Sequence, residues 1–167
     1  LDWSINQDKI PVAIRIPWTK VYHVYKEFRN EYFDTKYEVT RSGSKVAIIA
    51  LGSFYQLGEE IVDILANHGI KATLINPMFI SGIDNETLDS LKNTHELVVT
   101  LEDGILNGGF GAKIAQYYGL SHMKVMNKGF SMNIPNRFAP EKLMIDNRLL
   151  PSQVVQDILA NVRGEKA

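Results

Sequence analysis

Hydrophobic residues from Lys45 onward follow two alternating patterns. A continuous apolar run, typical of a strand buried on both faces of a sheet, occupies residues 45–52, and further strand-like segments occupy residues 70–76, 96–103 and 123–129. Other segments have features of helices, either apolar residues three or four positions apart or a capping residue at the start. They lie between and after the strand segments, at residues 53–68, 84–93, 110–118 and 151–164. Strands and helices that alternate with short turns predict an α/β fold. We expect a three-layer domain with a mostly parallel, roughly five-stranded sheet.

The ends of the predicted helices carry recognisable signals. Ser53 and Gln56 have the spacing of a capping box, and Asp84 is a suitable N-cap residue. Gly69 follows the last apolar position of one helix, where glycine often ends a helix. Pro151 suits the first turn of the last helix.

The first 33 residues differ from the rest, and we separate residues 1–33 from a main domain at residues 34–167. A strand-like run, Val12–Ile16, lies between two prolines. An aromatic and charged segment follows, in which four of the seven tyrosines fall between Tyr22 and Tyr37. Exposed aromatic side chains usually have a partner. The segment is therefore either a linker that packs on something or a peripheral hairpin of the same domain.

Composition narrows the class of protein. The chain of 167 residues is long enough for one domain with a sizeable core. Its net charge of −1 gives no electrostatic reason to expect nucleic acid or an acidic membrane as partner. The absence of cysteine rules out disulfides and thiolate metal sites, and it fits a cytoplasmic protein. Because the chain begins without Met, we expect it to be part of a longer protein.

The stretch "LEDGILNGGFGAKIAQYYG", residues 101–119, places four glycines in its first eleven positions, where a predicted strand leads into a predicted helix. It lacks the G-x-G-x-x-G spacing of dinucleotide-binding proteins and the Gly-Lys-Ser/Thr of a phosphate-binding P-loop. Free backbone N–H groups at the helix N-terminus could hold an anion. A tight turn, where another backbone comes close, is the favoured interpretation, because Glu102 and Asp103 would repel a phosphate.

Glu102 and Asp103 also end a predicted strand at the carboxyl edge of the sheet, where α/β proteins usually bind ligands. A pair of carboxylates at this edge either acts as a catalytic acid and base or is solvated loop charge. We favour solvated charge over catalysis.

The four histidines have no metal-ligand spacing. His68 suits the last turn of a helix, where a cation interacts favourably with the helix dipole, and His122 lies in a predicted loop. His23 and His95 are candidates to reach a site on a partner domain, although a structural role is favoured for each. The residues themselves therefore give no catalytic and no metal-binding assignment.

Three stretches of the chain match the motifs of a known family. The most specific is "THELVVTLEDGILNGGFGAKI", which is similar to S-H-E-x-x-V-T-V-E-E-x-x-x-x-G-G-F-G-S-x-V. The stretch from Ser42 to Asn76 is similar to the family's E-G-x-x-V-A-I-L-A-x-G segment and the strand that follows it, and "AIRIPW" is similar to I-R-Y-P-R. In this order they resemble the C-terminal domain of transketolase-type thiamine diphosphate enzymes, and most of all 1-deoxy-D-xylulose-5-phosphate synthases.

The resemblance implies that residues 1–33 are the tail of a preceding pyrimidine-binding domain plus a linker, and that residues 34–167 are the C-terminal domain. The full-length enzyme would be a homodimer that joins pyruvate to glyceraldehyde 3-phosphate with thiamine diphosphate and Mg²⁺. Most of the cofactor would be held by the N-terminal and pyrimidine domains, so this part would be inactive alone and would bind no cofactor tightly. The loop at Gly108, Gly109 and Gly111 would lie against a neighbouring domain and bind no ligand of its own.

Two departures from the family pattern concern substrate binding. Trp18 stands where the family has an arginine thought to help hold the substrate phosphate, and an indole cannot replace a bidentate guanidinium. Ser81 and Gly82 replace a usual Lys-Pro pair. The alternatives are another transketolase-like enzyme, the β-chain of an oxo-acid dehydrogenase, and a non-catalytic assembly module.

Overall fold

In a computed structural model of the chain, the structure describes residues 2–9, 11–14, 36–131 and 139–162. The chain divides into two compact units, residues 1–35 and 36–167. The described part of the first unit contains helix α1 (Asp2–Asn6) and an irregular stretch at residues 11–14. The strand expected at Val12–Ile16 is therefore wrong for residues 12–14, and residues 15 and 16 lie outside the described residues. The assignment of residues 1–33 to a preceding domain and a linker stays a prediction.

The second unit is built on a five-stranded sheet with the order β1-β3-β2-β4-β5. The four strands expected from the apolar runs are present and parallel: β2 (Lys45–Ala50), β3 (Thr73–Asn76), β4 (His95–Ile105) and β5 (Lys124–Phe130). The fifth strand, β1 (Glu38–Arg41), pairs antiparallel with β3 and was not expected. The prediction of a mostly parallel, five-stranded α/β sheet is confirmed.

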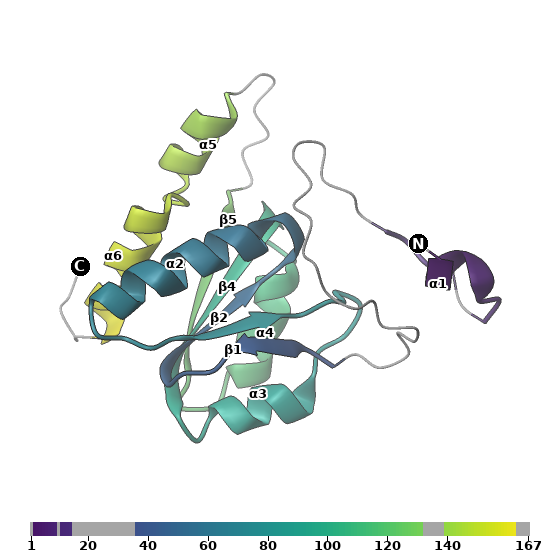
Figure 1. The fold of residues 1–167 in the computed structure, drawn as a ribbon, viewed down its shortest axis with the longest axis horizontal. Helices are drawn as coiled ribbons and strands as arrows, with labels where there is room; N and C mark the ends of the chain where they lie inside the picture. Colours follow the sequence, from purple (N-terminus) through teal and green to yellow (C-terminus); the bar gives the residue numbers. More distant parts are fainter. Residues whose placement is uncertain (1, 10, 15–35, 132–138, 163–167) are drawn as a thin grey trace. The chain divides into compact units, whose positions relative to one another are not determined.

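Helices cover both faces of the sheet (Figure 1). One face carries α2 (Tyr55–Asn67), which follows a single 3-10 turn at Gly52–Phe54, and α6 (Pro151–Val162). The other face carries α3 (Asn85–Leu91) and α4 (Phe110–Tyr118). Helix α5 (Pro140–Asp146), which the sequence did not predict, buries none of its residues.

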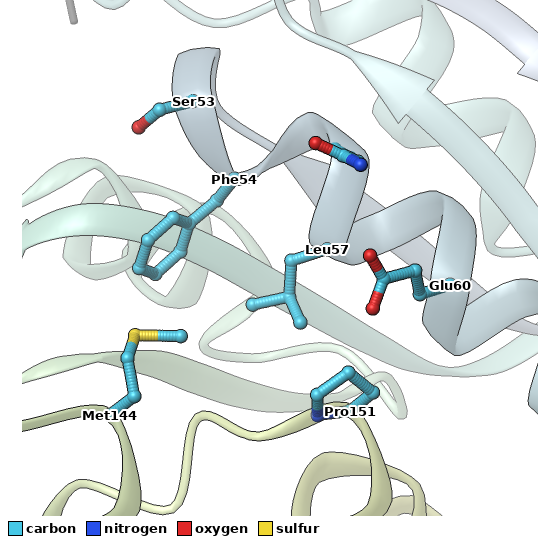
Figure 2. Close-up of a pocket in the computed structure, with 7 residues that line it drawn as sticks. Ser53, Phe54, Leu57, Glu60, Met144 and Pro151 are labelled. Carbon is cyan, nitrogen blue, oxygen red and sulfur yellow. The ribbon is translucent and has the colours of Figure 1, made fainter. Parts of the chain in front are cut away.

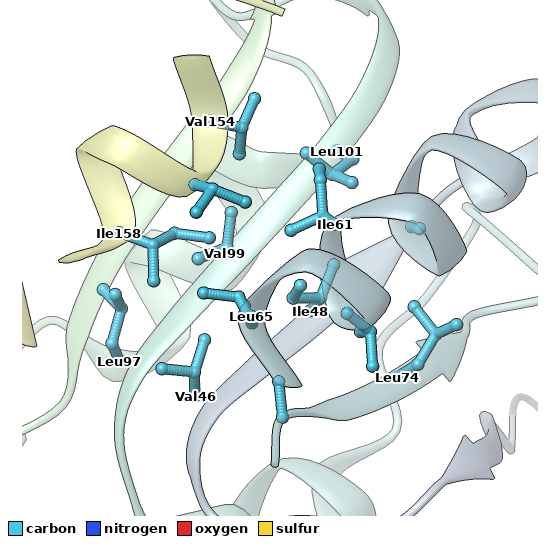
Figure 3. Close-up of a cluster of buried hydrophobic side chains, with 14 of the residues drawn as sticks. Val46, Ile48, Ile61, Leu65, Leu74, Leu97, Val99, Leu101, Val154 and Ile158 are labelled. Atoms are coloured by element: carbon cyan, nitrogen blue, oxygen red, sulfur yellow. The ribbon is translucent and has the colours of Figure 1, made fainter. Parts of the chain in front are cut away.

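Alternating side chains of each central strand divide between the two layers of core. On β2, Val46, Ile48 and Ala50 face α2 and α6, whereas Ala47 and Ile49 face α3 and α4. Figure 3 shows the first of these layers, in which strand residues meet apolar side chains of the two helices. Because both faces of β2 are buried, the strand reads in the sequence as an unbroken apolar run.

Helix α2 approaches the sheet closely through Gly58. A Cβ atom at this position would lie 2.8 Å from Cβ of Ala50 and 2.9 Å from Cδ1 of Leu74. Contacts below 3.0 Å are not tolerated in a packed core, so the interface requires a residue without a side chain.

The signals at the helix ends were confirmed at three of four places, including Pro151, which is the first residue of α6. Asp84 caps α3, since its carboxylate accepts a hydrogen bond from the backbone N–H of Thr87 at 3.1 Å. Gly69 follows α2 with φ of 78°, a conformation that favours glycine. The capping box at Ser53 and Gln56 is wrong, because α2 begins at Tyr55 after the 3-10 turn and has no side-chain cap.

Helix α6 is joined to β5 by ionic contacts. Asp157 accepts hydrogen bonds from Lys128 of β5 and from Arg148, which precedes α6. Burial would raise the pKa of Asp157, but these two cations outweigh it and lower the pKa. The contacts fix the register of α6 on the edge of the sheet.

Asp84 also joins β1 to the rest of the domain, because its carboxylate accepts a hydrogen bond from the backbone N–H of Tyr37 at 2.8 Å. Burial would raise the pKa of Asp84, but hydrogen bonds from Thr87 and Tyr37 outweigh it and lower the pKa. The stabilisation from the charged form is thus complete above the unfolded pKa and is lost as the pH falls through the lowered pKa.

We predict that Asp84→Ala lowers the free energy of unfolding at pH 7 by about 2–3 kcal/mol, because α3 loses its cap and a buried N–H loses its acceptor. The deficit should shrink in urea titrations as the pH falls below the unfolded pKa of about 4 and through the lowered pKa of the folded carboxylate. Glu86→Ala is the control, since the ion pair of Glu86 with Lys36 is exposed and should contribute less than about 1 kcal/mol. Equal losses in the two variants would contradict the role given to Asp84.

Candidate functional site

The glycine-rich loop lies at the carboxyl edge of the sheet and is organised around one buried carboxylate. Glu102, near the end of β4, is only 3% exposed. Its Oε2 accepts a hydrogen bond from the backbone N–H of Phe110 at 2.7 Å, and its Oε1 accepts one from the N–H of Gly111 at 3.1 Å. Both donors belong to the first turn of α4, so Glu102 caps this helix from a neighbouring strand.

Two of the loop glycines are required by close approach. A Cβ atom on Gly109 would meet the carboxylate of Glu102 and would lie 2.6 Å from the carbonyl oxygen of Ile105. A Cβ atom on Gly111 would lie 2.5 Å from Oγ1 of Thr100 and 2.8 Å from the side-chain amide of Asn127. The loop is therefore tightly packed against its own domain, which agrees with the tight-turn interpretation.

Gly108 is constrained differently. It has a φ of 74°, and the space around a Cβ atom there is open. Backbone conformation, rather than packing, therefore favours glycine at this position. Gly108 and Asn107 are exposed, so the tip of the loop is accessible from outside the domain.

The structure corrects the interpretation of the two acidic residues. Glu102 is neither solvated loop charge nor placed to act as an acid or base, because its two oxygens are engaged by α4 inside the domain. Asp103 is partly buried, and its carboxylate accepts a hydrogen bond from the hydroxyl of Ser53 at 3.1 Å. The anion that the helix N-terminus attracts is thus supplied by the chain itself.

Thr100 and Asn127, which the sequence analysis did not single out, complete the support of the loop. The hydroxyl of Thr100 donates to the side-chain oxygen of Asn127 at 2.8 Å, which links β4 to β5 directly below α4. Thr100 is fully buried. The sequence did contain a signal for Thr100, because it is a polar residue within an otherwise apolar strand.

The histidines take no part in a reactive cluster in the described part of the chain. His95 is buried, with Nε2 2.8 Å from the hydroxyl of Thr73 and Nδ1 2.9 Å from the hydroxyl of Thr94. Burial lowers the pKa of His95, which favours the neutral ring. His68 and His122 are exposed, and His23 lies outside the described residues. The structural interpretation favoured for His95 agrees with these contacts.

A groove of about 270 Å³ lies between the start of α2 and the junction of α5 with α6. Figure 2 shows the side chains of Phe54, Leu57, Met144 and Pro151 gathered around it, with Glu60 at its side. Glu60 is the one ionisable side chain in this lining, so the groove offers no pair of acid and base groups. Its lining combines apolar side chains with the polar side chains of Ser53, Gln56 and Glu60.

Within the described ranges, no three histidine, cysteine or acidic residues come together as metal ligands. In the same part of the chain, no helix combines the length and the apolar character needed to cross a membrane.

The fold and the glycine-rich loop define a class of protein. The chain belongs to the family described as transketolase, C-terminal domain, whose family model matches residues 35–146. This match confirms the resemblance drawn from the sequence motifs.

Curated relatives narrow the comparison. A 1-deoxy-D-xylulose-5-phosphate synthase of Lachnoclostridium phytofermentans is 31% identical over 173 residues, which cover 98% of this chain and 26% of that protein. A synthase of the same name from Clostridium acetobutylicum is 32% identical over 143 residues, which cover 83% of this chain and 22% of that protein. The chain thus spans about a quarter of the length of these relatives.

Solved structures support the fold. One described as a split gene transketolase, inactive β4 tetramer, superposes with a TM-score of 0.72 at 23% identity, over 86% of this chain and 48% of that one. Transketolase from Campylobacter jejuni superposes with a TM-score of 0.51 at 17% identity, over 75% of this chain and 18% of that one. At these identities the likeness shows a shared fold.

We predict that Glu102→Gln lowers the free energy of unfolding by about 1.5–3 kcal/mol, because the amide loses the charge and one of the two acceptor oxygens that hold α4. Amide hydrogen exchange at Phe110 and Gly111 should become faster in the same variant. Glu96→Gln is the matched control, since Glu96 is exposed on the same strand and should change stability by less than about 0.5 kcal/mol. Unchanged exchange at Phe110 and Gly111 would show that the cap does not hold the helix.

Proposed function

We propose that this chain is the C-terminal domain of a thiamine diphosphate-dependent transferase of the 1-deoxy-D-xylulose-5-phosphate synthase type, and that its role is to complete the assembly of the enzyme. The observation that carries the proposal is the match to synthases of that name over 98% of this chain. On this proposal the full-length enzyme condenses pyruvate with glyceraldehyde 3-phosphate, and carbon dioxide leaves. The glycine-rich loop at Gly108, Gly109 and Gly111 lies against a neighbouring domain.

The described residues do not fit the cofactor. A diphosphate group would need free hydrogen-bond donors. The backbone N–H groups of Phe110 and Gly111 at the start of α4 already donate to Glu102. A magnesium ion would need converging carboxylates, and the described ranges hold no such cluster. We therefore propose that thiamine diphosphate and Mg²⁺ are held by the preceding domains of the same protein, and that the enzyme pairs as a homodimer in the cytoplasm.

The proposal predicts a division of activity between the full-length enzyme and this chain. The full-length enzyme should release carbon dioxide from pyruvate when glyceraldehyde 3-phosphate, thiamine diphosphate and Mg²⁺ are present, and the 167-residue chain alone should release none. Calorimetric titration of the chain with thiamine diphosphate should show no binding at micromolar concentration.

The alternatives give different results in the same assay. A transketolase-like enzyme would transfer a two-carbon unit from a ketose phosphate instead of pyruvate, and an oxo-acid dehydrogenase β-chain would need a separate α-chain. A non-catalytic assembly module would leave the full-length protein inactive with all of these substrates. Omission of Mg²⁺ is the control for cofactor-dependent turnover.

A further prediction concerns Trp18, which lies outside the described residues. If the family arginine at this position holds the substrate phosphate, Trp18→Arg in the full-length enzyme should lower KM for glyceraldehyde 3-phosphate and leave KM for pyruvate unchanged. Trp18→Lys is the comparison, because a lysine supplies the charge without the bidentate geometry and should have a smaller effect. An unchanged KM for the aldehyde in both variants would mean that position 18 does not contact substrate.

A further inference from the structure

Asn107 and Gly108 form the exposed tip of the glycine-rich loop between β4 and α4. Asn107 is the one asparagine of this chain that is followed by glycine. Asparagine is a chemically labile residue, because the backbone nitrogen of the next residue can attack the carbonyl carbon of its side chain. A side chain on that next residue hinders the attack, and glycine has none. The loop tip therefore combines a reactive carbon with an unhindered nucleophile.

The structure leaves the nucleophile of this pair accessible. Gly108 has a φ of 74°, and the space that a Cβ atom would occupy there is open. The backbone N–H of Gly108 has no hydrogen-bond acceptor among the described residues. The turn is closed instead by the N–H of Gly109, which donates to the carbonyl oxygen of Leu106 at 3.2 Å. The nitrogen of Gly108 is thus held by no contact that would keep it from reacting.

A second exposed asparagine has the opposite arrangement. Asn93 lies between α3 and β4 and is exposed like Asn107. Thr94, which follows it, carries a branched side chain, and its backbone N–H donates to the carbonyl oxygen of Leu91 at 3.2 Å. Exposure therefore does not distinguish the two asparagines, whereas the backbone nitrogen that follows each of them does.

We propose that Asn107 is a site of spontaneous deamidation, and that the isoaspartate formed there loosens the start of α4. The backbone nitrogen of Gly108 bonds to Cγ of Asn107, and the bond from Cγ to the side-chain nitrogen breaks. That nitrogen leaves as ammonia with the proton of the Gly108 N–H, so a cyclic imide remains. Water then opens the imide at one of two bonds. Cleavage between the Gly108 nitrogen and Cγ gives aspartate, whereas cleavage between that nitrogen and the main-chain carbonyl carbon gives isoaspartate.

Isoaspartate lengthens the main chain by one atom, because the chain then runs through Cβ and Cγ of residue 107. The added atom lies inside the turn that the hydrogen bond from Gly109 to Leu106 closes. Gly109 has no room to move toward β4, because even a Cβ atom there would meet the carboxylate of Glu102. Phe110 follows directly and donates to the same carboxylate. We therefore expect the displacement to reach the cap of α4.

Ageing of the 167-residue chain at mildly alkaline pH tests whether Asn107 reacts. Peptide mapping by mass spectrometry should show loss of the side-chain amide at least about tenfold faster at Asn107 than at Asn93, because glycine leaves the attack unhindered. Asn107→Gln is the control, since glutamine would have to close a larger ring, and it should remove the conversion. Equal rates at Asn107 and Asn93 would overturn the site.

A synthetic peptide of residues 101–119 gives the rate in the absence of the fold. Because the structure leaves the tip of the loop accessible, the folded chain should react within about tenfold of the rate of the peptide. A rate in the folded chain more than about a hundredfold below that of the peptide would show that the fold protects Asn107, and it would overturn the site.

The two products separate the effect of the longer main chain from that of the new charge. Aged protein that an isoaspartate-specific methyltransferase labels should exchange the amides of Phe110 and Gly111 at least about tenfold faster than fresh protein. Asn107→Asp supplies the charge with a normal main chain, and its exchange at these amides should stay within about twofold of fresh protein.

Unchanged exchange in the labelled fraction would overturn the effect on α4. Equally fast exchange in Asn107→Asp would assign the effect to the charge and overturn the role given to isoaspartate. The reaction involves only this chain and water, so these results do not depend on the proposed function.

Discussion

The arrangement of the carboxyl edge depends on one interaction, the carboxylate of Glu102 held by the first turn of α4. The positive end of the helix and the buried anion stabilise each other, and the contact joins β4 to the helix that follows it. Gly109 and Gly111 are glycines because the carboxylate and the Thr100–Asn127 pair lie too close for a Cβ atom. The Glu102 contact and the Thr100–Asn127 pair thus together require glycine at these two positions, and the tip of the loop at Gly108 is left exposed.

That same contact decides what this edge can do. In many α/β proteins a glycine-rich turn at a helix N-terminus binds a phosphate, and the likeness in sequence invites that interpretation. Here the N-terminus of α4 is already neutralised by Glu102 from within the domain, so it is not an open site for an anion.

The fold was largely readable because its inner parallel strands β2, β3 and β4 are buried on both faces. A continuous apolar run marked β2, strand-like segments marked β3, β4 and β5, and the motif around the glycines identified the family. Strand β1 escaped notice because it is an edge strand of four residues, half-exposed and held by pairing with β3 and by Asp84. The prediction of a capping box at Ser53 failed because of a tertiary contact, since the Ser53 hydroxyl donates a hydrogen bond to the carboxylate of Asp103.

The sequence by itself determined the class of fold, the positions of its central strands and the family. Strands buried on both faces produce apolar segments, and the family motifs are short stretches of consecutive residues, so both can be recognised locally. Only the tertiary structure decided the roles of Glu102 and Tyr37. Local order cannot show that the carboxylate of Glu102 will turn inward to meet a helix eight residues later, or that the hydroxyl of Tyr37 will be buried with no hydrogen-bond partner among the described residues. Both outcomes depend on distances between segments that meet only when the sheet has formed.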